Sequence, residues 1–71
     1  MKEKVAERIL HLIEIHNINR NKLAVATGIS SGLIFDWTMA NKSPSLKNAI
    51  KVAQYFGVSL DYLVGLKDTP D

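Results

Sequence analysis

The chain has 71 residues and contains no cysteine. Without cysteine it can form neither a disulfide framework nor a thiolate metal site, and it has no cysteine nucleophile. This is consistent with a reducing cytoplasm, which is the expected location. The charged, amphipathic N-terminus lacks the apolar stretch of a signal peptide, and no apolar run approaches the ~20 residues that span a bilayer. We therefore expect one small domain with no membrane partner.

The chain also has little excess of positive over negative charge, because it contains 9 Lys and Arg residues and 7 Asp and Glu residues. The net charge of +2 permits nucleic-acid binding without arguing strongly for it. The sequence has no glycine-rich phosphate loop and no set of acids and bases typical of a catalytic pocket. His11 and His16 are too far apart for a two-histidine helical metal site, and no third ligand is evident. We expect no enzyme activity, no metal, no cofactor and no small-molecule ligand.

Strand signals are absent, and the hydrophobic periodicity predicts an all-α fold of five helices. The expected helices cover residues 2–16, 20–27, 31–39, 46–56 and 60–64. The expected N-caps are Asn19, Ser30, Ser45 and Ser59, and the glycines expected to end helices are Gly28, Gly57 and Gly65. Residues 1–66 are expected to form the domain, and residues 67–71 a flexible C-terminal tail.

The first and fourth helices carry apolar faces. In the first helix, Val5, Ile9 and Leu12 form a stripe that is expected to be buried. A second set, outside this stripe, consists of Leu10, Ile13 and Ile15. This set is either partly covered by the C-terminal helices or forms a contact surface for another chain. The face of the fourth helix that is expected to be buried consists of Leu46, Ala49, Ile50, Ala53 and Phe56.

Residues 19–37 predict two short helices joined by a tight turn. Gly28 can adopt a positive φ and redirect the chain, and Ser30 can cap the helix that follows. Ile34 and Trp37 are expected to anchor the underside of the second of these helices in the core. This is the steric pattern of a helix-turn-helix.

Gly32 lies in the first turn of the third helix, where glycine is less favourable than alanine by up to ~1 kcal/mol. A residue without a side chain at this position either fits a crowded contact or is a small local weakness. The sequence leaves both explanations open.

Two separated segments resemble the phage repressor/Cro-type helix-turn-helix family. One comprises residues 19–37 and 43–46, and the other is the closing motif GVSLDYL at residues 57–63. The resemblance extends over residues 5–65 and implies a compact five-helix, lambda-repressor-like domain. In that family the third helix enters the major groove of double-stranded DNA, usually in a homodimer on a palindromic site. The implied function is a transcriptional regulator, of the phage or mobile-element repressor type.

The resemblance also implies roles for individual residues. The positions that would face DNA bases are Ser31, Gly32, Leu33, Phe35 and Asp36. The positions that would face phosphates are Arg20, Asn41, Lys42 and Ser43. The dimer interface would lie near Tyr62, Val64 and Leu66, with the Leu10 and Ile13 patch as the competing surface.

The chain departs from the family after Trp37, where many members have several Lys or Arg residues and this chain has only Lys42. Because phosphate neutralisation supplies much of the affinity for DNA, we expect weaker binding than in a typical member. The alternative function is a protein-interaction module of the same fold with weak DNA affinity. Such a module would be an antitoxin, an antirepressor or a subunit of a larger regulator.

Overall fold

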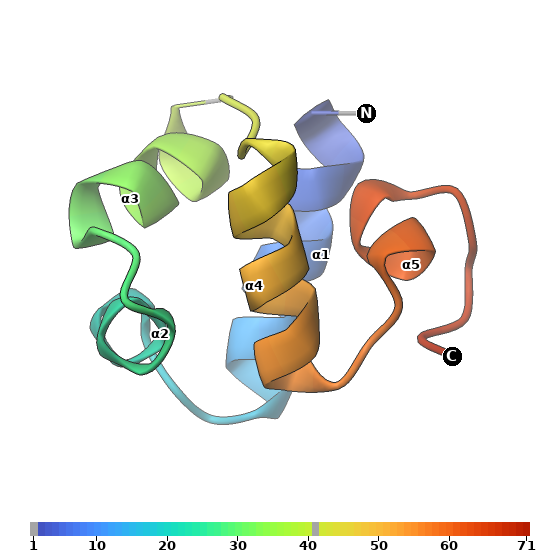
Figure 1. Cartoon of the computed structure of the whole chain (residues 1–71), viewed down its shortest axis with the longest axis horizontal. Helices are drawn as coiled ribbons and strands as arrows, with labels where there is room; N and C mark the ends of the chain where they lie inside the picture. The colour runs from blue at the N-terminus through green and yellow to red at the C-terminus, as the bar shows by residue number, and fades with distance from the viewer. Residues whose placement is uncertain (1, 41) are drawn as a thin grey trace.

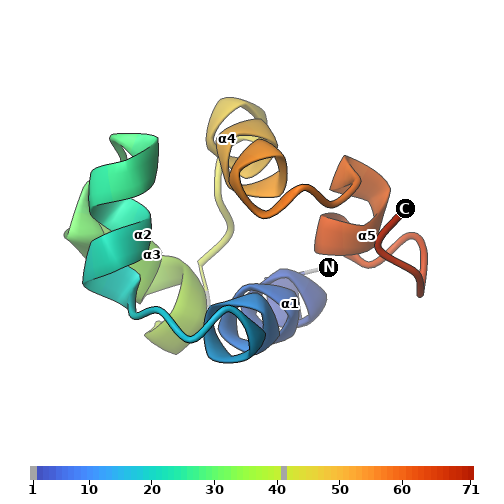
Figure 2. The same cartoon turned by 90° about the horizontal axis from the view of Figure 1, so that it is seen from below.

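All five expected helices are present in the structure, a computed structural model that describes residues 2–40 and 42–71, with side chains from Lys4 onward. The helices are α1 (Lys2–Ile15), α2 (Arg20–Thr27), α3 (Ser31–Met39), α4 (Leu46–Phe56) and α5 (Leu60–Val64). In Figure 1, α2 and α3 lie to one side of α1 and α4, and α5 lies to the other. α1 packs against α3 and α5, while α4 packs against α2 and α5 (Figure 2). The all-α fold is thereby confirmed.

Local capping sets where the helices begin and end. Each predicted N-cap side chain accepts a hydrogen bond, 2.8–3.2 Å long, from the backbone amide three residues ahead; the caps are Asn19, Ser30, Ser45 and Ser59. The three glycines predicted to end helices have φ values from 71° to 90°, a region that glycine enters without a Cβ clash. α1 ends at Ile15, one residue earlier than predicted, and Asn17 follows with a φ of 56°.

The buried residues form one core between α1 and α4, with contributions from all five helices. The predicted stripe of α1 is buried, as are Ile34 and Trp37 under α3. The members of the core are Val5, Ile9, Leu12, Leu23, Ala24, Ile29, Ile34, Trp37, Ala49, Val52, Ala53, Phe56, Tyr62 and Leu63. Burial of this apolar surface is the main source of stability in so small a domain.

The prediction for the inner face of α4 was partly wrong. Leu46 is 67% exposed and Ile50 is 38% exposed, whereas Val52, which the prediction left out, is fully buried. The reason is that α4 packs against α2 on one flank and α5 on the other, so its buried arc is centred between Ala49 and Phe56. Val52 lies within this arc, and the two exposed residues lie beyond its edge.

The C-terminal tail, which the sequence predicted to be flexible, makes defined contacts with the rest of the domain. The amide of Ser59 donates a hydrogen bond to the Pro70 carbonyl at 2.7 Å. The amide of Lys67 donates to the Asp61 carbonyl at 3.2 Å. A hydrogen bond from Thr69, together with the backbone of Asp71 and the charge of Lys67, holds the pKa of the Asp71 carboxyl below its usual range. Residues 66–71 therefore fold back on α5.

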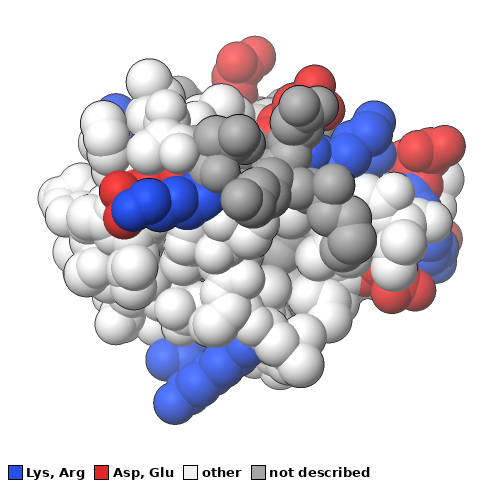
Figure 3. Space-filling view, turned by 90° about the horizontal axis from the view of Figure 1, so that it is seen from above, with Lys and Arg blue, Asp and Glu red and all other residues white. Residues whose placement is uncertain are grey.

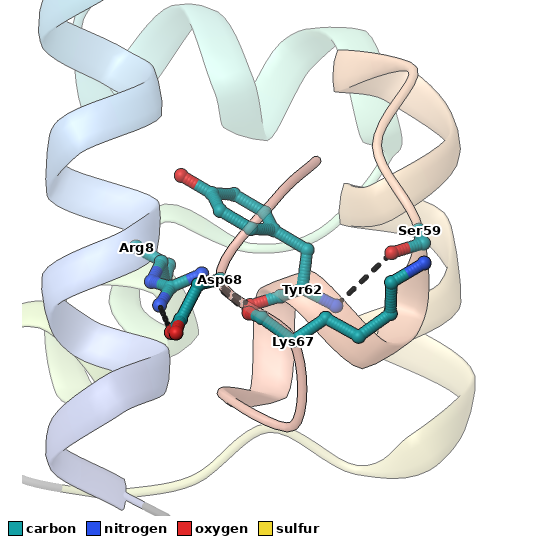
Figure 4. Close-up of polar contacts among 5 residues, drawn as sticks. All are labelled: Arg8, Ser59, Tyr62, Lys67 and Asp68. Carbon is teal, nitrogen blue, oxygen red and sulfur yellow. Dashed lines mark hydrogen bonds and ion pairs between the residues drawn. The ribbon is translucent and has the colours of Figure 1, made fainter. Parts of the chain in front are cut away.

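Arg8 joins α1 to this tail (Figure 4). One guanidinium nitrogen donates hydrogen bonds to the carbonyl of Tyr62 at 3.1 Å and to the carbonyl of Lys67 at 3.0 Å. The guanidinium carbon lies 4.1 Å from the centre of the Tyr62 ring, and the other terminal nitrogen lies 3.5 Å from Asp68. Nothing in the local sequence pattern singles out Arg8, because its partners are 54 or more residues away.

Candidate nucleic-acid interface

The outer face of α3 is open to solvent, and its underside is held in the core. Gly28, with φ of 74°, ends α2, and Ser30 caps α3, so the chain turns sharply between the two helices. Ile34 is fully buried and Trp37 is 2% exposed. The predicted seating of α3 is therefore confirmed, and no other described part of the chain seals its outer face.

The exposed side chains of α3 are mostly apolar. Leu33 is 42% exposed, Phe35 is 48% exposed and Met39 is 58% exposed. Ser31 and Gly32 are also exposed, while Asp36 is half-buried. All five predicted base-facing positions thus lie at or near the surface. Met39 is the most exposed of the three apolar side chains but was not among the predicted contacts.

Arg20 leans across to α3 from the first turn of α2. Its guanidinium carbon lies 5.6 Å from the centre of the Phe35 ring, a distance at which a cation and an aromatic face attract each other. Arg20 was predicted to face phosphate. Its half-buried position beside Phe35 keeps it next to the exposed face of α3.

An open groove of about 680 Å³ runs beside this pair, between α1, α2 and the start of α3. Its lining residues are Leu10, Ile13, Ile18, Asn19, Arg20, Asn21, Ser31, Gly32 and Phe35. Leu10 and Ile13, from the second apolar set of α1, therefore face the helix-turn-helix. One of the two explanations for this set was that the C-terminal helices cover it, and these two residues do not face those helices. Ile13 packs against the core, and Leu10 is 38% exposed. The sequence had not predicted this groove.

Positive charge near α3 is sparse, as the sequence indicated. The Lys and Arg side chains in Figure 3 form separate spots and no continuous patch. Lys42 and Ser43, both predicted phosphate contacts, are exposed. The Asp36 carbonyl accepts hydrogen bonds from the amides of Ala40 and Lys42, each 3.1 Å long, so Lys42 stays close to the end of α3. The predicted contact at Asn41 lies outside the described residues.

The three residues expected at a dimer interface differ in exposure. Tyr62 is 7% exposed, and its ring lies against Arg8, so its side chain belongs to the core and offers almost no surface to a partner. Val64 is half-buried, and Leu66 is 68% exposed. Of the three, Leu66 has the most surface available for a second chain.

No group of three or more His, Asp or Glu side chains among residues 4–40 and 42–71 could hold a metal ion. The His16 ring lies 4.9 Å from the Phe56 ring, centre to centre. None of the described helices is long and apolar enough to cross a membrane.

Gly32 is not in a crowded position. A Cβ built there would meet no other heavy atom within 4 Å. We therefore expect Gly32→Ala to raise the free energy of unfolding by up to about 1 kcal/mol, because alanine is the better helix former. Urea denaturation measures the change. Gly28→Ala is the matched control: its Cβ also meets no atom within 4 Å, but its φ of 74° makes alanine unfavourable. A loss of stability in Gly32→Ala would contradict the prediction.

The fold and the exposed α3 define a helix-turn-helix domain. A family model described as helix-turn-helix matches residues 11–63, so the chain belongs to the helix-turn-helix family, as the sequence resemblance had predicted. The chain is also similar to the uncharacterized HTH-type transcriptional regulator YobD of Bacillus subtilis (strain 168), with 31% identity over 65 residues. This match covers 92% of the chain but 58% of YobD, so the chain spans less than two thirds of its relative. No solved structure matches the chain significantly.

Proposed function

We propose that the chain is a DNA-binding transcriptional regulator whose α3 enters the major groove of double-stranded DNA. The observation that carries the proposal is the seating of α3, with Ile34 and Trp37 buried beneath it and its outer face open. Family membership and the likeness to a regulator support the same function. We further propose a cytoplasmic repressor of the phage or mobile-element type, acting as a homodimer without a cofactor or enzymatic activity.

Arg20, Lys42 and Ser43 are the proposed phosphate contacts among the described residues, and Asn41 completes the set predicted from the sequence. The number of cations beside α3 is small, so binding is expected to be weak and its salt dependence shallow for a helix-turn-helix protein. Affinity measured over a range of salt concentrations, on duplexes selected from a random pool, tests the proposal. Absence of both enrichment and salt-dependent binding would overturn it.

Arg20→Ala and Lys42→Ala are each expected to weaken binding about three- to tenfold on every duplex, because phosphate contacts carry no sequence information. Each should also lower the salt slope by about 1. Asp36→Ala should instead change the preferred sequence, because a carboxylate near the bases accepts hydrogen bonds from particular amino groups. Lys51→Ala, on α4 and outside the proposed contacts, is the control and should leave both properties unchanged. Equal behaviour of all four variants would contradict these assignments.

The dimer is proposed to form through α5 and the tail around Leu66, at a spacing that sets the two α3 helices ~34 Å apart. Leu66→Glu is expected to shift the protein to monomer in sedimentation at increasing concentration, because it places a charge in an apolar contact. The double variant Leu10→Glu/Ile13→Glu is the matched test of the competing patch. If the double variant is monomeric and Leu66→Glu still dimerises, the dimer interface lies at the Leu10 and Ile13 patch and not at the tail.

A second candidate function is a protein-interaction module of the same fold, as an antitoxin, an antirepressor or a subunit of a larger regulator. The apolar groove beside Phe35 and the scarcity of cations near α3 favour it. A stable complex with a host protein that blocks the groove, together with no selected duplex, would support this function over DNA reading.

A further inference from the structure

The chemistry of α3 limits which bases it can read. Its sequence, SGLIFDWTM, contains no Arg, Lys, Asn or Gln, the residues that make bidentate hydrogen bonds to guanine and adenine. Its exposed side chains are the hydroxyl of Ser31, the half-buried carboxylate of Asp36 and three large apolar groups. Direct recognition of bases by α3 would therefore depend mainly on contacts between its apolar side chains and the base edges.

In the major groove, apolar contact favours one base. The thymine C5 methyl is the apolar group that the base edges present there, whereas guanine presents two acceptors and adenine a donor and an acceptor. An apolar side chain packed on guanine would remove water from N7 and O6 without replacing their hydrogen bonds, which is unfavourable. An apolar reading face thus selects thymine and rejects guanine.

Leu33 is the residue best placed for this contact. Phe35 faces the groove and Arg20. Met39 is the last residue of α3, whereas Leu33 lies in its first turn, the part of a recognition helix that contacts the bases, and is 42% exposed and outside the groove. Gly32, the residue before Leu33, lines the groove together with Phe35.

We infer that Leu33 determines specificity by contacting thymine C5 methyl groups, and that the DNA site facing α3 is rich in thymine. The inference rests on the proposed function of DNA binding through α3.

The test replaces single thymines with deoxyuridine in a duplex selected by the protein. Deoxyuridine keeps every hydrogen-bonding group and removes the methyl group alone. We expect about a fourfold loss of affinity at each contacted thymine, the equivalent of ~0.8 kcal/mol for one buried methyl-sized group. In Leu33→Ala the difference between thymine and deoxyuridine should disappear at one of these positions. Leu46→Ala removes an exposed leucine from α4 and is the matched control, which should retain the full difference.

The outcomes separate the inference from the proposed function. Sequence-selective binding in which no deoxyuridine replacement changes affinity by twofold would overturn the role of Leu33 and leave DNA binding intact. A thymine preference that persists unchanged in Leu33→Ala would also overturn it. Failure to enrich any duplex would overturn the proposed function, and the inference with it.

Discussion

Gly65→Ala is expected to lower the free energy of unfolding by about 2–4 kcal/mol. Gly65 has a φ of 90°, where a Cβ is strained, and a Cβ built there would lie 2.7 Å from Cβ and 2.8 Å from Cγ of Lys4 on α1. These Lys4 atoms are next to the backbone, so relief requires α1 and α5 to move apart, at a penalty typical of overpacking. A chain of this size has roughly 4–10 kcal/mol of stability in total. The melting temperature should therefore fall by roughly 10–25 °C.

Gly57→Ala separates the two contributions to this loss. Gly57 has a φ of 71°, and its Cβ would meet no other heavy atom within 4 Å. Its substitution should lower stability by only about 1 kcal/mol, from backbone strain alone. Urea denaturation of both variants under the same conditions gives the difference. Equal losses would mean that contact with Lys4 contributes nothing to the Gly65 effect.

Arg8→Met is expected to lower the free energy of unfolding by about 2–3 kcal/mol. Methionine preserves the apolar stem but removes both hydrogen bonds to the carbonyls of Tyr62 and Lys67. Hydrogen bonds to a charged group contribute about 1.5–3 kcal/mol each, and the exposed Lys67 carbonyl regains water when its bond is lost. The stacking of the guanidinium on the Tyr62 ring is lost as well. Urea denaturation measures the total effect.

Asp68→Ala is the control for the ion pair of Arg8. The Asp68 side chain is 97% exposed, and an ion pair of this kind contributes less than about 1 kcal/mol. Hydrogen exchange at the Ser59 amide, which donates to Pro70, reports on the tail directly. Faster exchange at Ser59 in Arg8→Met, with little change in Asp68→Ala, is the expected pair of results. If the two variants lose stability equally, the ion pair and not the carbonyl bonds holds the tail.

The helices could be predicted from the sequence because their boundaries depend on neighbouring residues. A cap such as Ser30 bonds to an amide three residues ahead, and a glycine such as Gly57 ends its helix through its own φ. The buried stripe of α1 and the anchors under α3 follow from helical periodicity in the same way. These signals lie within a few residues of the feature that they determine, so one sequence suffices to find them.

The features that escaped prediction all depend on contacts between distant segments. The role of Arg8 and the folding back of residues 66–71 require knowledge of where α1 meets α5. The exposure of Leu46 and the burial of Val52 depend on how α4 is rotated between its two neighbours. Tyr62 has a surface-like place in the family pattern, but the guanidinium of Arg8 covers its ring.

In the candidate site, too, the features that depend on neighbouring residues could be predicted, and those that depend on distant segments could not. The exposure of Phe35 followed from the inward position of Ile34 and Trp37 on the same helix, whereas Leu33 was named only through the family resemblance. The groove beside α3 did not, because it is formed by residues from α1, α2 and α3 that only the fold brings together. Whether Gly32 is crowded also depends on the surroundings, which the structure shows to be empty.

The bond from Arg8 to Lys67 joins residues 59 positions apart, and this has a consequence for synthesis on the ribosome. Chains are made from the N-terminus, so α1 leaves the exit tunnel well before α5 and the tail that complete its surroundings. Until Leu63 emerges, the nascent domain lacks one of the fully buried side chains of its core. Within this domain α1 is translated before the other helices, and its contacts with α5 form only when translation of the domain is nearly finished.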